Sequence, residues 1–203
     1  SKAYIEILKE VDVPVVFLDF YDEHGEFDCV ISDNFYSAYE ITNYLINKGH
    51  TKIAFVGNIY ATSSIQDRFL GYYKSLLEHG MQLDKEYIIS DRDNDGKLID
   101  LSIPKNLPTA FVCNCDRIAY NLAKKLNEQG YRIPEDCSIV GFDNDIFSTL
   151  SDLKLTTVEV NMKEMAETAI KIIMSKVQDS NKKYGRVSIK GKIIYRDSVE
   201  QIK

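Results

Sequence analysis

"DNFYSAYEITNYLINKGHTKIAFVG", residues 33–57, predicts a helix followed by a buried strand. Its apolar residues Ala38, Ile41 and Leu45 recur at a spacing of three or four, which is the period of the buried face of a helix. Gly49 is a typical helix stop, because glycine readily adopts the left-handed conformation that ends many helices. The short apolar run that follows, residues 53–56, predicts a strand that is buried on both faces.

The same order of helix, glycine and short apolar strand occurs twice more. Residues 65–80 end on a glycine before the strand 86–90, and the predicted apolar face of their helix consists of Phe69, Tyr73, Leu76 and Leu77. Residues 115–130 end on a glycine before the strand 137–143, and their apolar face consists of Ile118, Ala119, Leu122 and Leu126. Helices that alternate with fully apolar strands are typical of a parallel sheet with both faces covered. The sequence therefore predicts an α/β fold with a doubly wound parallel sheet.

The remaining segments predict further elements. We expect a helix over residues 1–10, strands at 13–19 and 155–160, and two short strands around Gly191. Residues 161–177 predict a helix whose buried side carries Met162, Met165, Ala169, Ile173 and Val177. Residues 90–108 have little room for a full crossover helix, so we expect a loop or a short helical turn there.

The composition excludes several classes of function. The chain has 203 residues, of which 44% are hydrophobic and 28% charged, and no apolar run approaches the roughly 20 residues of a membrane helix. The net charge of −6 argues against this chain gripping a phosphate backbone, which requires clustered Lys and Arg. Four cysteines are too few for a disulfide framework at this length. Since no stretch of signal-peptide type opens the sequence, we expect the protein in the cytoplasm.

Polar and aromatic residues follow the predicted strands. In open parallel sheets, ligands bind beyond the carboxyl ends of the strands, so these residues are the candidates for a binding site. The candidates are Asp19, Phe20, Tyr60, Ser64, Arg68, Cys115, Asp116 and Asp143. Carboxylates and an arginine form paired hydrogen bonds to vicinal hydroxyls, and aromatic faces cover the C–H surface of a sugar, so the set suits a polyol. The alternative is that Asp116 and Asn144 only cap helices.

Two motifs suggest other chemistry, and both are incomplete. Cys113 and Cys115 have a C-x-C spacing, but a structural zinc site needs four ligands and no second pair exists. Residues 91–102 begin like a calcium-binding loop, but its last position is Ser102 where a glutamate is required, and no amphipathic helix precedes it. No strand is followed by a glycine-rich phosphate cradle or a nucleophile elbow. The sequence therefore predicts no metal, no cofactor and no enzymatic activity.

Six stretches, in order, resemble the effector-binding domain of the LacI/GalR (lactose-repressor) family of bacterial transcription regulators. The resemblance covers nearly the whole chain and rests on "VPVVFLD", the stretch 33–57, "DRFLGYYKSLLEHG", "PTAFVCNCDRIAYNLAKKLNEQGYRIPEDCSIVGFDN", "LTTVEVNMKEMAETAI" and "YRDS". It implies a two-lobe fold of the type I periplasmic-binding-protein kind, with a sugar or related effector in the cleft between the lobes. The C-terminal lobe is then expected at 32–160 plus 190–203, and the N-terminal lobe at 1–31 plus 161–189.

The resemblance also assigns roles to single residues. It implies that Asp19, Arg68 and Asp143 hold the effector. Cys115 stands where relatives usually have an asparagine, and Asn114 is expected to point to the other side of an extended strand. Family members carry a helix-turn-helix DNA-binding domain and further elements of the first lobe ahead of these stretches. We therefore expect a truncated chain with an incomplete first lobe.

Together these features predict the sensor domain of a cytoplasmic LacI-type regulator. Its partners would be a small polar effector, a second copy of the chain, and DNA through a domain other than this one. The first alternative is a sugar receptor of the same fold that serves a transporter or a kinase, and the second is an enzyme that converts a sugar or nucleotide. A signal peptide encoded upstream would indicate the receptor, and a helix-turn-helix would indicate the regulator.

Overall fold

The computed structural model describes residues 2–22 and 24–202 and divides into two compact units. The first unit comprises Ser1–Asp33 and Asn161–Lys190, and the second comprises Asn34–Val160 and Gly191–Lys203. In the described residues no helix is both long and apolar enough to cross a membrane.

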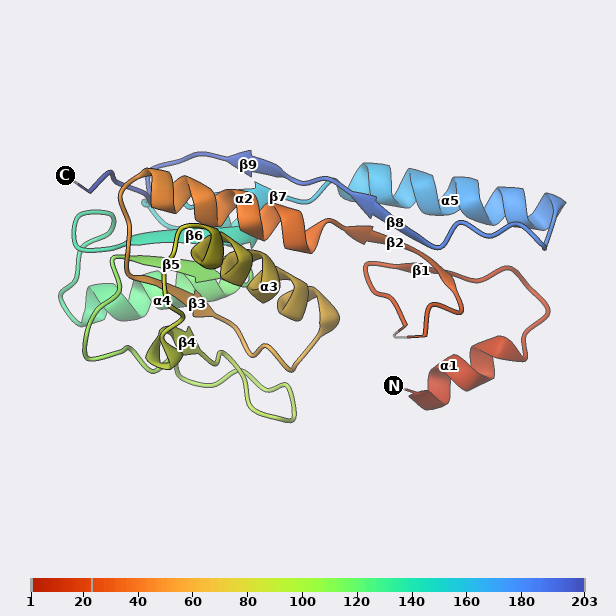
Figure 1. The fold of residues 1–203 in the computed structure, drawn as a ribbon, viewed down its shortest axis with the longest axis horizontal. Helices are drawn as coiled ribbons and strands as arrows, with labels where there is room; N and C mark the ends of the chain where they lie inside the picture. Colours follow the sequence, from red (N-terminus) through yellow and green to blue (C-terminus); the bar gives the residue numbers. More distant parts are fainter. Residues whose placement is uncertain (1, 23, 203) are drawn as a thin grey trace. The chain divides into compact units, whose positions relative to one another are not determined.

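The second unit is built on a six-stranded sheet (Figure 1). Its strands lie in the order β4-β3-β5-β6-β7-β9, and all neighbours are parallel except β9, which runs antiparallel to β7. This sheet confirms the predicted doubly wound parallel architecture. The strands span β3 (Ile53–Val56), β4 (Ile88–Ile89), β5 (Ala110–Cys113), β6 (Ser138–Asp143), β7 (Thr156–Glu159) and β9 (Lys192–Ile194).

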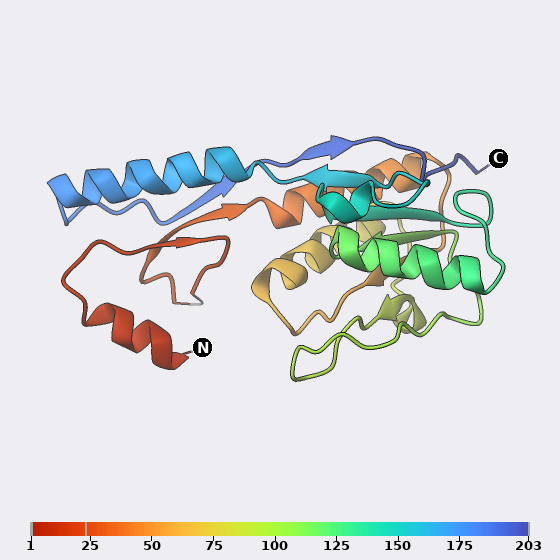
Figure 2. The ribbon, with the colours of Figure 1, turned by 180° about the vertical axis from the view of Figure 1, so that it is seen from behind.

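Helices cover both faces of this sheet (Figures 1 and 2). Alternate residues of a strand point to opposite faces, so Phe55 packs with α2 (Asn34–Asn47) and α3 (Ser63–Glu78), whereas Val56 packs with α4 (Asp116–Glu128). Short 3₁₀ helices span η1 (Lys85–Tyr87) and η2 (Ile146–Ser148). The predicted apolar faces of α2 and α4 are confirmed, since all of their predicted residues are buried.

The apolar face predicted for α3 is partly wrong. The buried residues of this helix include Tyr72 and Leu76, whereas Leu77 is 57% exposed. The reason is a close approach of α2 at Gly71, where an added Cβ would lie 2.0 Å from the carbonyl oxygen of Phe35. Because α3 packs against a second helix as well as the sheet, its buried face is rotated from the one that the apolar period alone predicts.

The first unit is a parallel sheet of three described strands in the order β1-β2-β8. They span β1 (Val16–Leu18), β2 (Asp28–Ser32) and β8 (Arg186–Ile189). Helix α5 (Met162–Gln178) packs against β1 and β2, and side chains of α1 (Lys2–Lys9) pack around Phe17. The buried residues of α5 are Met165, Ala169 and Ile172, so the prediction that Met162 and Val177 are buried was wrong.

The remaining elements have separate outcomes. The two short strands around Gly191 are confirmed, but β8 belongs to the sheet of the first unit and β9 to that of the second. Strand β2 was not predicted. Residues 90–108 are confirmed as a loop, which contains a single bridge between Arg92 and Leu98.

Candidate functional site

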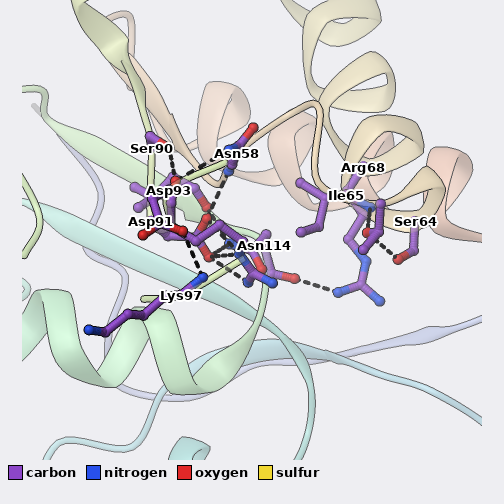
Figure 3. Close-up of polar contacts among 12 residues, drawn as sticks. Asn58, Ser64, Ile65, Arg68, Ser90, Asp91, Asp93, Lys97 and Asn114 are labelled. Atoms are coloured by element: carbon purple, nitrogen blue, oxygen red, sulfur yellow. Dashed lines mark hydrogen bonds and ion pairs between the residues drawn. The ribbon is translucent and has the colours of Figure 1, made fainter. Parts of the chain in front are cut away.

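The carboxyl ends of β3, β4, β5 and β6 carry a connected set of polar side chains (Figure 3). These strands are parallel neighbours, so the residues that follow them gather at one edge of the sheet. Arg68 projects to this edge from the second turn of α3 and is only 8% exposed. It is the cation around which the other predicted residues of this unit can be placed.

The guanidinium of Arg68 is held on three sides. Its Nε donates to Oδ1 of Asn34 at 2.8 Å, and Nη1 donates to the carbonyl oxygen of Asn114. Its Nη2 lies 3.3 Å from Oδ1 of Asp143, and the group stacks over the ring of Phe142 at 3.7 Å. A buried planar cation that is fixed in this way loses little rotamer entropy when it binds a ligand oxygen.

Asp143 ends β6 in a strained backbone conformation. Its φ is 104°, and the next residue, Asn144, has a φ of 55°, both in the left-handed region that disfavours side chains. The turn is held by Asn144, whose Nδ2 donates to Oε1 of Glu159 at 2.9 Å and whose Oδ1 accepts from Arg196 at 2.5 Å. The carboxylate of Asp143 is about a third exposed, so it is accessible to a ligand while it pairs with Arg68.

The structure buries Asp116 completely, at the start of α4. Its Oδ1 accepts from the hydroxyl of Thr157 at 2.6 Å, and its Oδ2 accepts from the backbone N–H of Asp145 at 3.0 Å. Burial, with a smaller contribution from the charges of Asp143 and Asp145, raises the pKa of this carboxyl to about 7, although these two hydrogen bonds act to lower it. Asp116 thus fastens the turn that follows β6, which places it behind Asp143.

Three further predicted residues lie on the segments that follow β3 and β5, namely Tyr60, Ser64 and Cys115. Cys115 is the N-cap residue of α4, where its Sγ makes no side-chain cap hydrogen bond, and burial raises the pKa of its thiol. The hydroxyl of Ser64 lies 3.0 Å from that of Thr62, the N-cap residue of α3. Tyr60 is 87% exposed, and its backbone N–H donates to Oδ1 of Asn58.

The other two predicted residues, Asp19 and Phe20, lie in the first unit. Asp19 directly follows β1 with a φ of 64°, and its backbone N–H donates to the carbonyl of Val30 at 2.8 Å. The ring of Phe20 stacks on that of Phe17 at 4.3 Å and is about half exposed. Of the described residues other than glycine, those with positive φ are Asp19, Asp143 and Asn144. Backbone strain therefore coincides with two of the predicted ligand residues.

Sequence reasoning missed three residues that support Arg68 or the loops beside it. Asn34 begins α2 and accepts from Arg68, while the side chain of Asn114 is buried and donates to the carbonyl of Val56 at 2.9 Å. Asp91 is also buried, and it binds Asn114 and Asn58 (Figure 3). The strand-end rule does include Asn58 and Asn114 as positions. No signal in the sequence joins them to Asp91, because that pairing depends on the order of strands in the sheet.

The acidic loop that resembles the start of a calcium site is bonded to the protein itself. The carboxylate of Asp91 accepts from Arg92, and Oδ1 of Asp93 accepts from the backbone N–H groups of Asp95 and Lys97. Among the residues that the structure describes, no three His, Cys, Asp or Glu side chains are grouped so as to hold a metal ion.

Comparison with known proteins identifies the family of this domain. The profile of the periplasmic binding protein-like domain matches residues 42–199. The PurR transcriptional repressor of Vibrio vulnificus is 28% identical over 198 residues, which are 96% of this chain and 59% of that protein. The arabinose metabolism repressor of Geobacillus stearothermophilus is 29% identical over 213 residues, covering 100% of this chain and 58% of the repressor. The chain thus spans about three fifths of the length of these relatives.

Solved structures match the fold over the same extent. A LacI transcriptional regulator from Bacillus cereus subsp. cytotoxis has a TM-score of 0.84 and 29% identity, with 99% of this chain and 73% of that chain covered. A LacI family regulator from Enterococcus faecium, solved with bound ribose, has a TM-score of 0.84 and 24% identity, with 100% and 77% covered. The chain therefore belongs to the periplasmic binding protein-like domain family, as an effector-binding domain of the LacI/GalR type.

Proposed function

We propose that this chain senses a small polyhydroxylated effector, such as a monosaccharide, for a LacI-type transcription regulator. The observation that carries the proposal is the pair of Arg68 and Asp143 at the carboxyl end of β6. Arg68 is a donor that is already fixed in place, and Asp143 is an acceptor on a strained backbone. An arginine and a carboxylate side by side match the donor and acceptor pattern of vicinal hydroxyls. The ribose-bound neighbour supports this class of ligand. Purines are the class to test against it.

The proposed contacts start from residues that the second unit brings together. Arg68, Asp143 and Cys115 would contact the effector, whereas Asp19 and Phe20 of the first unit stay ligand residues predicted from the sequence. Asp116 would act behind Asp143, since both of its carboxylate oxygens already bind protein donors. An effector shifts an equilibrium between two arrangements of a protein only if it binds one of them more tightly, and we propose that this effector has such a preference.

The activity of the regulator follows from that preference. We propose that the effector changes DNA affinity through a DNA-binding domain distinct from residues 1–203, in a cytoplasmic homodimer, and that the effector is bound without being converted. The coupling can be no larger than the difference in effector affinity between the two arrangements. Operator binding by the regulator, measured with and without effector, tests this step, and a ligand that is turned over would instead support an enzyme.

The effector class is tested by isothermal titration of the protein with D-ribose, L-arabinose, hypoxanthine and guanine. We expect a sugar to bind and Asp143→Ala or Arg68→Ala to abolish its binding. The matched controls are Arg132→Ala and Asp136→Ala, which break an exposed ion pair beyond α4 and should leave binding unchanged. Asp143→Asn keeps the shape of the side chain and guards against loss of folding. Unchanged sugar binding in Asp143→Asn and Arg68→Ala would refute the site, and binding of a purine alone would refute the sugar.

A further inference from the structure

The structure buries a second carboxylate, Asp91, completely, and surrounds it with donors (Figure 3). Its Oδ1 accepts from the backbone N–H of Asn58 at 2.8 Å, and its Oδ2 accepts from Nδ2 of Asn114 at 3.0 Å. The side chain of Arg92 adds an ion pair at 2.6 Å. Burial alone would raise the pKa of Asp91, but the hydrogen bonds from Arg92, Asn58 and Asn114 outweigh it and lower the pKa. The carboxylate is therefore ionised at neutral pH, and each of its oxygens accepts hydrogen bonds from protein groups.

The donors to Asp91 come from three neighbouring strand ends. Asn58 lies two residues beyond β3, Arg92 lies beyond β4, and Asn114 directly follows β5. These strands are adjacent in the order β4-β3-β5, and a further bond from Nδ2 of Asn58 to the carbonyl of Arg92 at 3.2 Å closes the set. The carboxylate of Asp91 thus connects the three loops that follow β3, β4 and β5.

Asn114 connects this set to Arg68. Its side-chain Nδ2 donates both to Asp91 and to the backbone carbonyl of Val56, which fixes the side chain. The backbone carbonyl of Asn114 accepts from Nη1 of Arg68. The space for that side chain exists because residue 57 is a glycine, where an added Cβ would lie 2.9 Å from Nδ2 of Asn114. The orientation of the carbonyl that receives Arg68 is therefore set by groups buried beneath it.

We propose that Asp91 is a positioning residue of the effector site, which orients Arg68 through Asn114 and the segment of Tyr60 through Asn58. The inference rests on the proposed function for its ligand, although its structural part does not. Oδ1 of Asn58 accepts from the backbone N–H of Tyr60 at 3.0 Å, so the network ends at two of the predicted ligand residues. Asp91 itself does not touch the effector.

The competing explanation is that Asp91 only stabilises the loops. Two variants separate these explanations. Asp91→Asn keeps the shape of the side chain but turns one acceptor into a donor, which then faces an N–H group of Asn58 or Asn114. Asn114→Ala removes the side-chain amide but leaves the backbone carbonyl that accepts from Arg68. The matched control is Ser198→Ala, which removes a buried hydroxyl that bonds Thr156 and Ile139. These bonds lie at the amino ends of β7 and β6, away from the carboxyl ends that carry the candidate site. All three variants should lower the melting temperature.

The readout that separates positioning from stability is the hydrogen exchange of the Arg68 Nη1–H group, which donates to the backbone carbonyl of Asn114 and which NMR detects at low temperature. Its signal is assigned by its loss in Arg68→Lys. If Asp91 positions Arg68, the exchange rate should rise about tenfold or more in Asp91→Asn and in Asn114→Ala, because the backbone carbonyl that accepts from Nη1 is no longer held in place by the side chain of residue 114. In Ser198→Ala the rate should stay at the wild-type value. An unchanged rate in Asp91→Asn would overturn the proposal.

The second readout is the affinity for D-ribose as a probe. The Kd should rise about tenfold in Asp91→Asn and no further in the double variant with Asn114→Ala, because both changes break one pathway. A Kd that stays at the wild-type value while the melting temperature falls would show a purely stabilising role and would refute the proposal. If the wild-type protein does not bind D-ribose, that result counts against ribose as the effector, and the exchange of Arg68 still decides the role of Asp91.

Discussion

Arg68 and Asp143 are 75 residues apart in the sequence, yet Nη2 of Arg68 lies 3.3 Å from Oδ1 of Asp143. The pair joins the second turn of α3 to the end of β6, and it is completed by Asn34 and by the carbonyl of Asn114. Four segments therefore depend on one guanidinium. A buried group with this many partners contributes to folding, and this contribution can be measured separately from the proposed binding.

Replacing Arg68 with methionine should lower the free energy of unfolding by about 3 kcal/mol, because the acceptors of Asn34 and Asn114 lose their buried donor. Methionine keeps most of the volume over the ring of Phe142, so packing changes little. Urea unfolding at neutral pH measures the difference. Arg132→Met, which removes an exposed ion pair with Asp136, is the control and should leave stability unchanged. A loss no larger than that of the control would contradict the buried role.

Asp116 should make the protein less stable as the pH rises through neutrality. Burial raises its pKa from 3.8 to about 7, so the folded state binds the proton more tightly than the unfolded state. The stability that this proton contributes is complete below pH 3.8 and is lost as the pH rises through about 7. The neutral Asp116→Asn does not titrate, so its stability relative to wild type should increase between pH 5 and pH 8 in urea unfolding.

The control for Asp116 is a buried carboxyl shifted in the opposite direction. Asp28 accepts from Lys176 and from the backbone N–H groups of Tyr184 and Gly185; these bonds outweigh its burial and lower its pKa. Asp28→Asn should therefore differ from wild type by a constant amount between pH 5 and pH 8. If Asp116→Asn also showed a constant difference, its carboxyl would not hold a proton near neutral pH.

His50 should have the opposite dependence on pH. It is buried, its Nδ1 lies 3.1 Å from the hydroxyl of Thr109, and its Nε2 donates to the carbonyl of Glu200 at 3.1 Å. Burial lowers its pKa below 6.5, so stability is complete above pH 6.5 and falls as the pH drops through the lowered value. The stability advantage of wild type over His50→Gln should therefore shrink from pH 7.5 to pH 5 in urea unfolding.

Ser138→Ala is the matched control, since it removes another bond to the same C-terminal segment, from the backbone N–H of Glu200 to the Ser138 hydroxyl. It has no titrating group, so its loss of stability should be the same at both pH values. An advantage over His50→Gln that stays constant across this range would show that the histidine is not buried in its neutral form.

The sequence predicted those parts of the fold that depend on local period. The faces of α2 and α4 follow from spacing alone, because each packs mainly on the sheet. The face of α3 did not, since Gly71 lets α2 approach and rotates the buried side. Strand β2 was missed because Asp28 opens it, and that carboxylate is satisfied by Lys176, 148 residues away. No local pattern contains such a partner.

The candidate site shows the same division. The rule that ligands lie beyond strand ends identified Arg68 and Asp143, and the strained φ of Asp143 supports it independently. Asp91 was weighed only as part of a calcium loop, because its partners Asn58 and Asn114 lie 33 and 23 residues from it along the chain. Which loops meet is decided by the strand order β4-β3-β5, and that order is a property of the folded sheet.

Cys115 is the predicted site residue at which the resemblance to the family leads one to expect an asparagine. As the N-cap residue of α4 its Sγ makes no side-chain cap hydrogen bond, whereas an asparagine oxygen would accept from the first turn of the helix. Cys115→Asn should therefore raise the free energy of unfolding by about 1 kcal/mol. It should also change the relative affinities for D-ribose and L-arabinose, because an amide donates and accepts where the thiol does so weakly. Cys115→Ala separates the two effects, since it removes the thiol without adding a cap. Equal stability of Cys115→Asn and Cys115→Ala would contradict the capping argument. Sugar affinities equal to wild type in both variants would show that Cys115 only packs.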